Sequence, residues 1–152
     1  GPSIAYQGSY RATQILREVA ERLDDPSVAT VAGRGLGRSY GDAAGNAGGG
    51  VLDLTGLDTV LDFDTTTGRV RAGAGVALRG LLAAALREGW FCPVVPGTAS
   101  VTLGGAFAAD VHGKNHHEVG TLSSHVTGAH LVAPAWRGWV SPEQEPEYFW
   151  AA

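Results

Sequence analysis

The stretch Gly33-Arg34-Gly35-Leu36-Gly37-Arg38-Ser39-Tyr40-Gly41-Asp42 is the first of two glycine-rich segments in this chain. The second runs Pro96-Gly97-Thr98-Ala99-Ser100-Val101-Thr102-Leu103-Gly104-Gly105 and continues into Asp110-Val111-His112-Gly113-Lys114-Asn115-His116-His117. Each follows a short run typical of a β-strand. Glycine lets a backbone approach a ligand closely and direct several N–H groups at it. Two such loops, with basic and imidazole side chains among them, predict a cradle for a large phosphorylated cofactor.

The bulk composition indicates one globular domain over residues 1–152. Of these residues 44% are hydrophobic and 17% charged, which allows a hydrophobic core of its own. The opening Gly1-Pro2-Ser3 is interpreted as the remnant of a cleaved expression tag. A net charge of −4 without a basic block argues against a nucleic-acid partner. The single cysteine, Cys92, excludes an internal disulfide and is expected to be a small buried hydrophobe.

The periodicity of apolar residues places the two loops in an α+β domain. Strands are expected at 28–32, 51–54, 60–64, 69–72, 93–95 and 126–133, and helices at 11–23, 78–86 and 101–109. Ser141-Pro142-Glu143-Gln144 has the N-cap, first-turn proline and capping-box glutamine that begin a helix. Because the strands and helices lack regular βαβ spacing, the class is α+β rather than α/β.

The first loop matches neither of the common nucleotide-binding fingerprints. A GxGxxG pattern fails in both frames, because Arg38 and Tyr40 stand where the third glycine belongs. A phosphate-binding loop of the Walker type fails as well, because Lys114 is followed by asparagine. The simplest alternative is a surface turn. The side chains of Arg34, Arg38 and Ser39 favour anion binding over that alternative.

The imidazoles of His112, His116 and His117 offer a metal site as an alternative to a ligand site. Gly113 and Asn115 disfavour the helix on which a four-residue histidine spacing binds metal. Imidazoles beside a lysine are better suited to holding or polarising a polar ligand. We therefore predict no metal here.

Together, residues 33–42, 96–105 and 112–117 resemble the vanillyl-alcohol-oxidase-type FAD-binding flavoproteins, and within them the subfamily that oxidises decaprenylphosphoryl ribose. The resemblance covers residues 28–150. The run His-Gly-Lys-Asn-His-His is unusual, and its occurrence together with both glycine loops makes the resemblance specific to the subfamily. It implies a domain with two small sheets flanked by helices. The chain 1–152 would then be the FAD-binding domain without the family's substrate domain and last FAD-binding segment.

The resemblance also implies roles for the residues of both loops. The first loop would wrap the FAD pyrophosphate with its N–H groups. Tyr40, His112 and Lys114 would lie near the flavin and the substrate and act as catalytic residues. Since Arg38 stands where many relatives carry the histidine that bonds FAD, the cofactor would be noncovalent. The implied cofactor-binding set is Arg34, Gly35, Leu36, Gly37, Arg38, Ser39, Tyr40, Pro96, Gly97, Thr98, Val101, Thr102, Gly104, Gly105, Ala108, Ala109, Val111 and His112.

The implied reaction is oxidation of a secondary hydroxyl of a polyprenyl-phosphoryl pentose by hydride transfer to flavin N5. This step begins the 2'-epimerisation of decaprenylphosphoryl ribose, a cell-wall arabinan precursor, and a short-chain reductase partner would complete it. Such a substrate implies peripheral membrane contact and a location in the cytoplasm or at the membrane on the cell-envelope side. The alternative is a non-catalytic flavin- or nucleotide-binding module that needs a partner chain.

Overall fold

The computed structural model describes residues 3–134 and 136–152, with side chains described from residue 14 onward within these ranges. The expected tag remnant therefore lies mostly outside the described residues, and its last member, Ser3, begins helix α1. The elements in chain order are α1 (Ser3–Asp24), β1 (Val31–Arg34), β2 (Gly50–Asp53), β3 (Val60–Asp64), β4 (Arg69–Ala72), α2 (Leu78–Arg87), α3 (Leu103–Ala108), α4 (His116–Val119), the 3-10 helix η1 (Leu122–His125), β5 (Ala129–Ala133), β6 (Trp136–Val140) and α5 (Pro146–Ala151).

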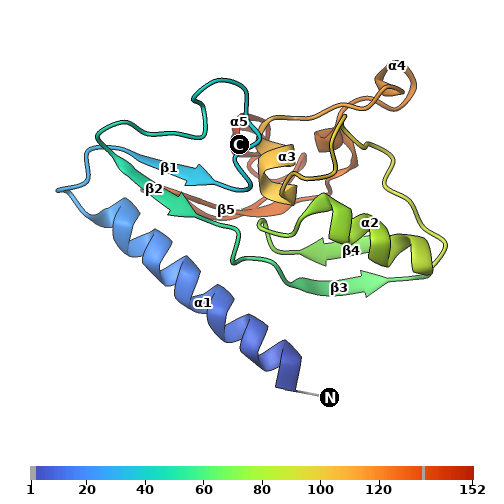
Figure 1. Ribbon diagram of the computed structural model, residues 1–152, viewed down its shortest axis with the longest axis horizontal. Helices are drawn as coiled ribbons and strands as arrows, with labels where there is room; N and C mark the ends of the chain where they lie inside the picture. Colours follow the sequence, from blue (N-terminus) through green and yellow to red (C-terminus); the bar gives the residue numbers. More distant parts are fainter. Residues whose placement is uncertain (1–2, 135) are drawn as a thin grey trace.

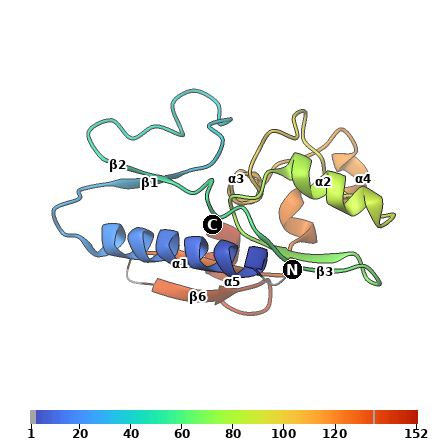
Figure 2. The same cartoon turned by 60° about the horizontal axis from the view of Figure 1, so that its bottom comes forward.

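The strands form small sheets that helices flank, so the predicted α+β class is confirmed. Within the described ranges there are three two-stranded sheets, β1–β2, β3–β4 and β5–β6, where two sheets were expected. Helix α1 runs along one side of β1 and β2, while α2 lies beside the β3–β4 hairpin (Figure 1). The connection between β1 and β2 and the segments around α3 rise on the same side of the molecule, away from β6 (Figure 2). Both glycine segments therefore reach one side of the fold.

Strands β1 and β2 are parallel, which explains the long connection between them. Their register pairs Val31 with Gly50 and Arg34 with Asp53. Parallel neighbours need a crossover of a dozen or more residues. Here residues 35–49 form that crossover, and they contain most of the first glycine segment. The Asn46 side chain closes its far end by donating to the carbonyls of Thr30 and Gly50 at 3.1 and 2.9 Å.

Two clusters of buried residues support the second glycine segment. Val76, Leu78 and Leu81 form one cluster around α2. Val94, Ala106 and Leu122 form the other, under α3 and η1. Helix α2 ends in a Schellman motif, in which the Trp90 N–H donates to the Ala85 carbonyl and Gly89 has φ +78°. Cys92 is half-buried rather than fully buried, and it packs against the first cluster.

Three predicted strands differ from the observed elements. The strand expected at 28–32 begins three residues later, at Val31, where pairing with β2 starts. Residues 93–95 form no strand. Val94 is fully buried there, and Asn115 donates its amide to the Pro93 carbonyl in place of a neighbouring strand. The strand expected at 126–133 begins at Ala129, because η1 occupies residues 122–125.

The last helix begins later than its capping signal predicts. The Ser141 hydroxyl accepts the N–H groups of Glu143 and Gln144 at 3.1 and 3.0 Å, as an N-cap would. The helix nevertheless starts at Pro146, after Glu145 in a left-handed conformation with φ +54°. A residue before proline is disfavoured in the helical region, so Pro146 prevents the helix from starting earlier.

Candidate cofactor site

The two glycine segments meet at Gly35 and Thr102. A Cβ placed on Gly35 would lie 2.2 Å from the Thr102 Oγ1, so only glycine fits at this position. Thr102 is 3% exposed, and its hydroxyl accepts the Gly105 N–H at 3.2 Å as the N-cap of α3. The crossover therefore leaves β1 directly against the start of α3. The structure brings together the two loops that the sequence places far apart.

Backbone hydrogen bonds hold the second segment along residues 74–79. The Leu103 N–H donates to the Val76 carbonyl at 2.8 Å, and the Leu78 N–H donates to the Val101 carbonyl at 2.9 Å. At Gly104 an added Cβ would lie 2.8 Å from the Cβ of Ala74, so the backbones approach closely there too. These contacts fix the segment before any ligand binds.

The first segment presents N–H groups that the folded chain does not use. In the part of the chain that the structure describes, the N–H groups of residues 35–39 donate to no protein acceptor. Gly37 is left-handed, with φ +63°, and the Arg34 guanidinium lies beside it, 2.9 Å from where a Cβ would stand. Successive N–H groups around a left-handed glycine form an anion-binding concavity. The donors present therefore fit a diphosphate.

The second segment borders a hollow of about 530 Å3 that Gly97, His112, Gly113, Lys114 and His116 line. The hollow is broad and open to solvent. Gly97 faces open space, because a Cβ built there meets nothing within 4 Å. The rings of His112 and His116 contact edge-on, with centroids 5.2 Å apart. Of the predicted site residues, Gly97, His112 and Lys114 are thus brought to one place.

The histidine segment is folded rather than open, which the sequence did not predict. Residues 116–119 form the single turn α4, which follows Asn115. His116 Nδ1 lies 3.2 Å from the Gly113 carbonyl, whereas the exposed His117 lies 3.8 Å from the Glu118 carboxylate. Among the described residues, no group of three or more His, Cys, Asp or Glu side chains could hold a metal ion.

Asp110 is a residue of this region that the sequence analysis did not single out. Its Oδ1 accepts the Ser123 N–H at 3.0 Å, which ties the end of α3 to η1. Burial acts to raise the pKa of Asp110, but hydrogen bonds from the Ser123 N–H and hydroxyl and from the Thr121 hydroxyl, with His112 nearby, hold it below the ordinary value. The Asp110 carboxylate is therefore ionised and accepts hydrogen bonds from the segment that contains η1. The feature that marks Asp110 is its positive φ of 40°, and a backbone angle cannot be read from the sequence.

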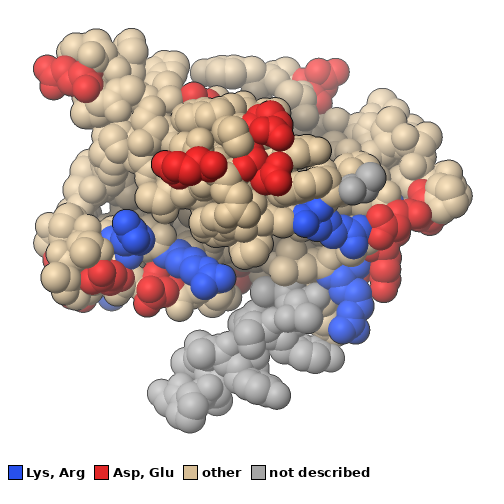
Figure 3. Space-filling model, turned by 180° about the vertical axis from the view of Figure 1, so that it is seen from behind, with Lys and Arg blue, Asp and Glu red and all other residues tan. Residues whose placement is uncertain are grey.

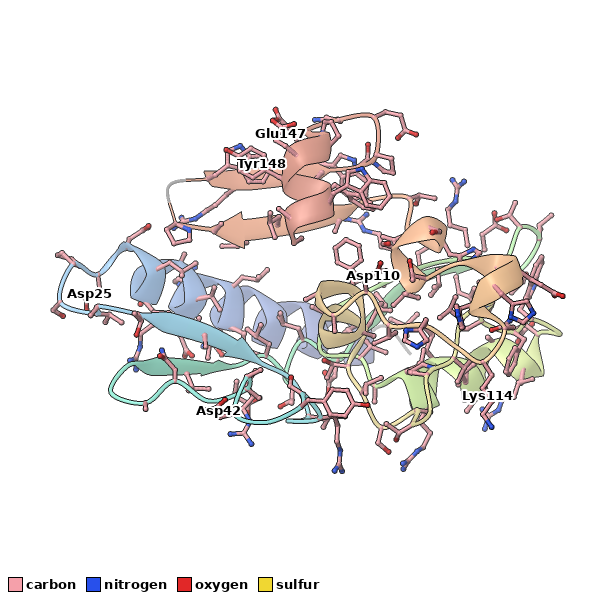
Figure 4. All side chains as sticks on the ribbon, turned by 90° about the horizontal axis from the view of Figure 1, so that it is seen from above. Asp25, Asp42, Asp110, Lys114, Glu147 and Tyr148 are labelled. Carbon is pink, nitrogen blue, oxygen red and sulfur yellow. The ribbon has the colours of Figure 1, made fainter. Side chains whose placement is uncertain are left out.

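Other predicted site residues lie outside the hollow. Tyr40 is 98% exposed on the crossover. Ala108 and Ala109 are exposed at the end of α3, and Val111 packs against the second buried cluster. In Figure 4 the crossover that carries Asp42 and the segment that carries Lys114 lie on either side of α3, and Asp110 lies toward α5. The roles that the resemblance implies for these residues remain predictions.

The opposite face of the molecule looks less suited to an anionic ligand. In Figure 3 acidic side chains gather near the centre of that face, and the Lys and Arg side chains in view lie in separate groups below them and to their right. No continuous basic surface is visible on this view of the described residues. The connection between β1 and β2, which contains residues 35–39, rises on the same side as the segments around α3 (Figure 2).

Comparisons with known proteins show the family and the fold of the chain. Residues 16–135 match the model of a family described as FAD binding domain. Over 131 residues the chain is 41% identical to decaprenylphosphoryl-beta-D-ribose oxidase of Mycolicibacterium smegmatis, a match that covers 86% of this chain and 28% of that protein. The fold matches 6-hydroxy-D-nicotine oxidase from Arthrobacter nicotinovorans with a TM-score of 0.72 and 28% identity. That match covers 93% of this chain and 30% of the oxidase.

These matches confirm the vanillyl-alcohol-oxidase-type fold and FAD as the cofactor expected from the two glycine segments. The chain spans under a third of the length of either relative.

Proposed function

The chain belongs to the family of FAD-binding domains, and from this we propose that it forms the FAD-binding part of an oxidoreductase acting on a secondary hydroxyl of a polyprenyl-phosphoryl pentose. The observation that carries the proposal is the hollow that joins Gly97 to His112 and Lys114. It is supported by the 41% identity to an oxidase named for decaprenylphosphoryl ribose.

The binding of FAD is assigned to the two glycine segments. The N–H groups of residues 35–39 and the Arg34 guanidinium would hold the diphosphate. Gly97, with open space before it, would let the rest of the cofactor approach the backbone. Arg38 offers no imidazole for a covalent bond, so we propose noncovalent binding.

The chemistry of the site divides between the cofactor and the side chains. Bound FAD would supply the hydride acceptor. The Lys114 ammonium would attract the phosphate of the substrate. The His112 imidazole would orient the reacting hydroxyl and accept its proton at a ring nitrogen. Tyr40, exposed on the crossover, is proposed to contact the substrate from the other loop.

A polyprenyl substrate requires the enzyme to work at a membrane surface, and we propose peripheral contact for that reason. Among the described residues, no helix is long and apolar enough to cross a membrane. We also propose a short-chain reductase as the partner that completes epimerisation, because a ketone product must be reduced to invert the carbon.

The first experiment is an absorbance spectrum of the purified chain incubated with FAD and freed of excess cofactor. We expect flavin bands in the protein fraction, with all colour released into the supernatant by acid precipitation. Colour retained in the pellet would contradict noncovalent binding. A colourless protein that ignores added FAD would overturn the proposal.

The second experiment tests the activity itself. The FAD-loaded chain is mixed with a short-chain analogue of polyprenyl-phosphoryl ribose and a dye electron acceptor. Dye reduction that depends on the analogue supports the oxidoreductase proposal. A chain that binds FAD without turnover would instead be a flavin-binding module that needs further protein for catalysis.

A further inference from the structure

We propose that Asp110 is a positioning residue, which clamps the end of α3 to η1 and thereby fixes the His112 imidazole in the hollow. The inference rests on the proposed function, because His112 is the residue proposed to accept the substrate proton.

The backbone at Asp110 is the first observation. Its φ is +40°, a left-handed value, and in the described ranges Glu145 is the other non-glycine residue with positive φ. Such conformations persist where the surrounding contacts over-determine them, and they cluster at functional sites. Glycine would adopt this conformation without strain, so the roles of the backbone and of the carboxylate can be tested separately.

The contacts of Asp110 are the second observation. Its N–H donates to the Phe107 carbonyl at 2.9 Å, which ends α3. Its Oδ1 accepts the Ser123 N–H at 3.0 Å, across to η1. Ser123 is 8% exposed, so this bond is shielded from water on one side. The carboxylate therefore joins two stretches that lie thirteen residues apart.

The path from Asp110 to His112 is the third observation. The next contact along the two stretches is the Leu122 N–H, which donates to the Val111 carbonyl at 2.9 Å. The contact after that is a β-bridge between His112 and Thr121. The Asp110–Ser123 hydrogen bond is thus the first of three consecutive contacts between the two stretches, and the third involves His112, whose side chain lines the hollow. Loss of the first contact would weaken the third and let the His112 ring move.

The test compares three variants of the chain by NMR of the histidine rings, with the His112 signal assigned by its loss in H112Q. In D110G the glycine adopts the left-handed backbone without strain, but the oxygen that accepts the Ser123 N–H is removed. D110N keeps an acceptor oxygen and tolerates the same φ, so it serves as the rescue. E145G changes the other left-handed residue, at α5, and is the matched control.

We expect the His112 ring signals to shift in D110G, to stay near their wild-type positions in D110N, and to remain unchanged in E145G. The signals of His117 and His130 should stay in place in all three. An unchanged His112 signal in folded D110G overturns the proposal. Should D110G fail to fold, D110S replaces it, because the shorter serine side chain cannot reach the Ser123 N–H as a carboxylate does.

The same variants are then titrated with FAD and assayed for dye reduction. We expect turnover to fall about tenfold or more in D110G and to be largely restored in D110N, with E145G equal to wild type. Wild-type protein that binds no FAD would overturn the proposed function, while the ring signals would still decide the role of Asp110. Equal turnover in D110G and wild type would overturn the positioning role in catalysis.

Discussion

Gly35 and Gly97 serve different purposes, although both belong to the glycine segments. A Cβ at Gly35 would collide with the buried Thr102, whereas a Cβ at Gly97 meets nothing within 4 Å. The first glycine is needed for the fold to close, and the second leaves space for a ligand. Composition alone does not separate these two uses.

This difference predicts opposite effects of alanine at the two positions. G35A should lower the free energy of unfolding by about 1–3 kcal/mol, as overpacking does. G97A should leave stability nearly unchanged and weaken FAD binding at least about tenfold, because the methyl group occupies the space before the backbone. Chemical denaturation and flavin-fluorescence titration measure the two effects. G97A with wild-type FAD affinity would show that the cofactor does not approach Gly97.

The thiol of Cys92 offers a further test at the scale of one residue. Burial raises the pKa of the Cys92 thiol above its ordinary value, so less thiolate is present at a given pH. We expect the native protein to react with a disulfide reagent at pH 8 at least about tenfold more slowly than the unfolded chain. The time course of thiol release measures this rate. Equal rates in buffer and in denaturant would contradict the packing of Cys92 against the α2 cluster.

At the scale of elements, one glycine inside α2 and one just after its end have opposite requirements. Gly80 is in the first turn, and a Cβ there meets nothing within 4 Å. Gly89 ends the helix with φ +78°, a conformation that alanine disfavours.

G80A should therefore stabilise the protein by about 0.5–1 kcal/mol, because alanine loses less conformational freedom in a helix. G89A should destabilise it by about 1–2 kcal/mol, the cost of a left-handed alanine. Urea denaturation of both variants gives the two values, and each serves as the control for the other. If both variants raised or both lowered the free energy of unfolding, the assignment of Gly89 to the C-terminal end of α2 would be contradicted.

The elements that the sequence predicted well are those with a local cause. The apolar stripe of α2 and the β3–β4 hairpin follow from side-chain periodicity and turn chemistry, as in the Asp64 carboxylate that accepts the Thr66 N–H. The one-turn helices α4 and η1 are too short to show periodicity. In the run 93–95 only Val94 is fully buried, against Ala106 and Leu122, so its apolar sequence reflects packing with distant residues rather than strand pairing. Pro146 overrode the capping signal at Ser141 because of steric exclusion.

For the molecule as a whole, the sequence predicted the class of ligand that the site binds but not how the residues of the site are arranged. Glycines beside basic and imidazole residues indicated a phosphorylated cofactor, and the three motifs together indicated FAD. The contact of Gly35 with Thr102 and the clamp of Asp110 depend on how the segments pack, which no local pattern encodes. Tyr40 was assigned to the site from resemblance alone, and its side chain stands exposed on the crossover.

Acid stability tests the fold as a unit, because lowered carboxyl pKa values occur at three separate turns. Side-chain and backbone hydrogen bonds from Ser27 lower the pKa of Asp25, and bonds from Thr67 and Thr66 lower that of Asp64. At Asp110 the bonds outweigh the opposing effect of burial. A carboxyl whose pKa is lower in the folded state than in the unfolded chain stabilises the fold above the unfolded value and loses this effect as pH falls through the folded value.

The thermal unfolding midpoint should therefore gain from these groups at all pH values above about 3.8, the ordinary aspartate value, and fall as the pH drops below it. Scanning calorimetry between pH 2 and 7 measures the midpoint. D64N should lower the midpoint at neutral pH and flatten its fall in acid, since an amide does not titrate. D62N, on a neighbouring strand position with an exposed side chain, is the matched control and should follow the wild-type curve. An acid limb of unchanged steepness in D64N would show that the turn at residues 64–67 does not contribute to the linkage between protonation and folding.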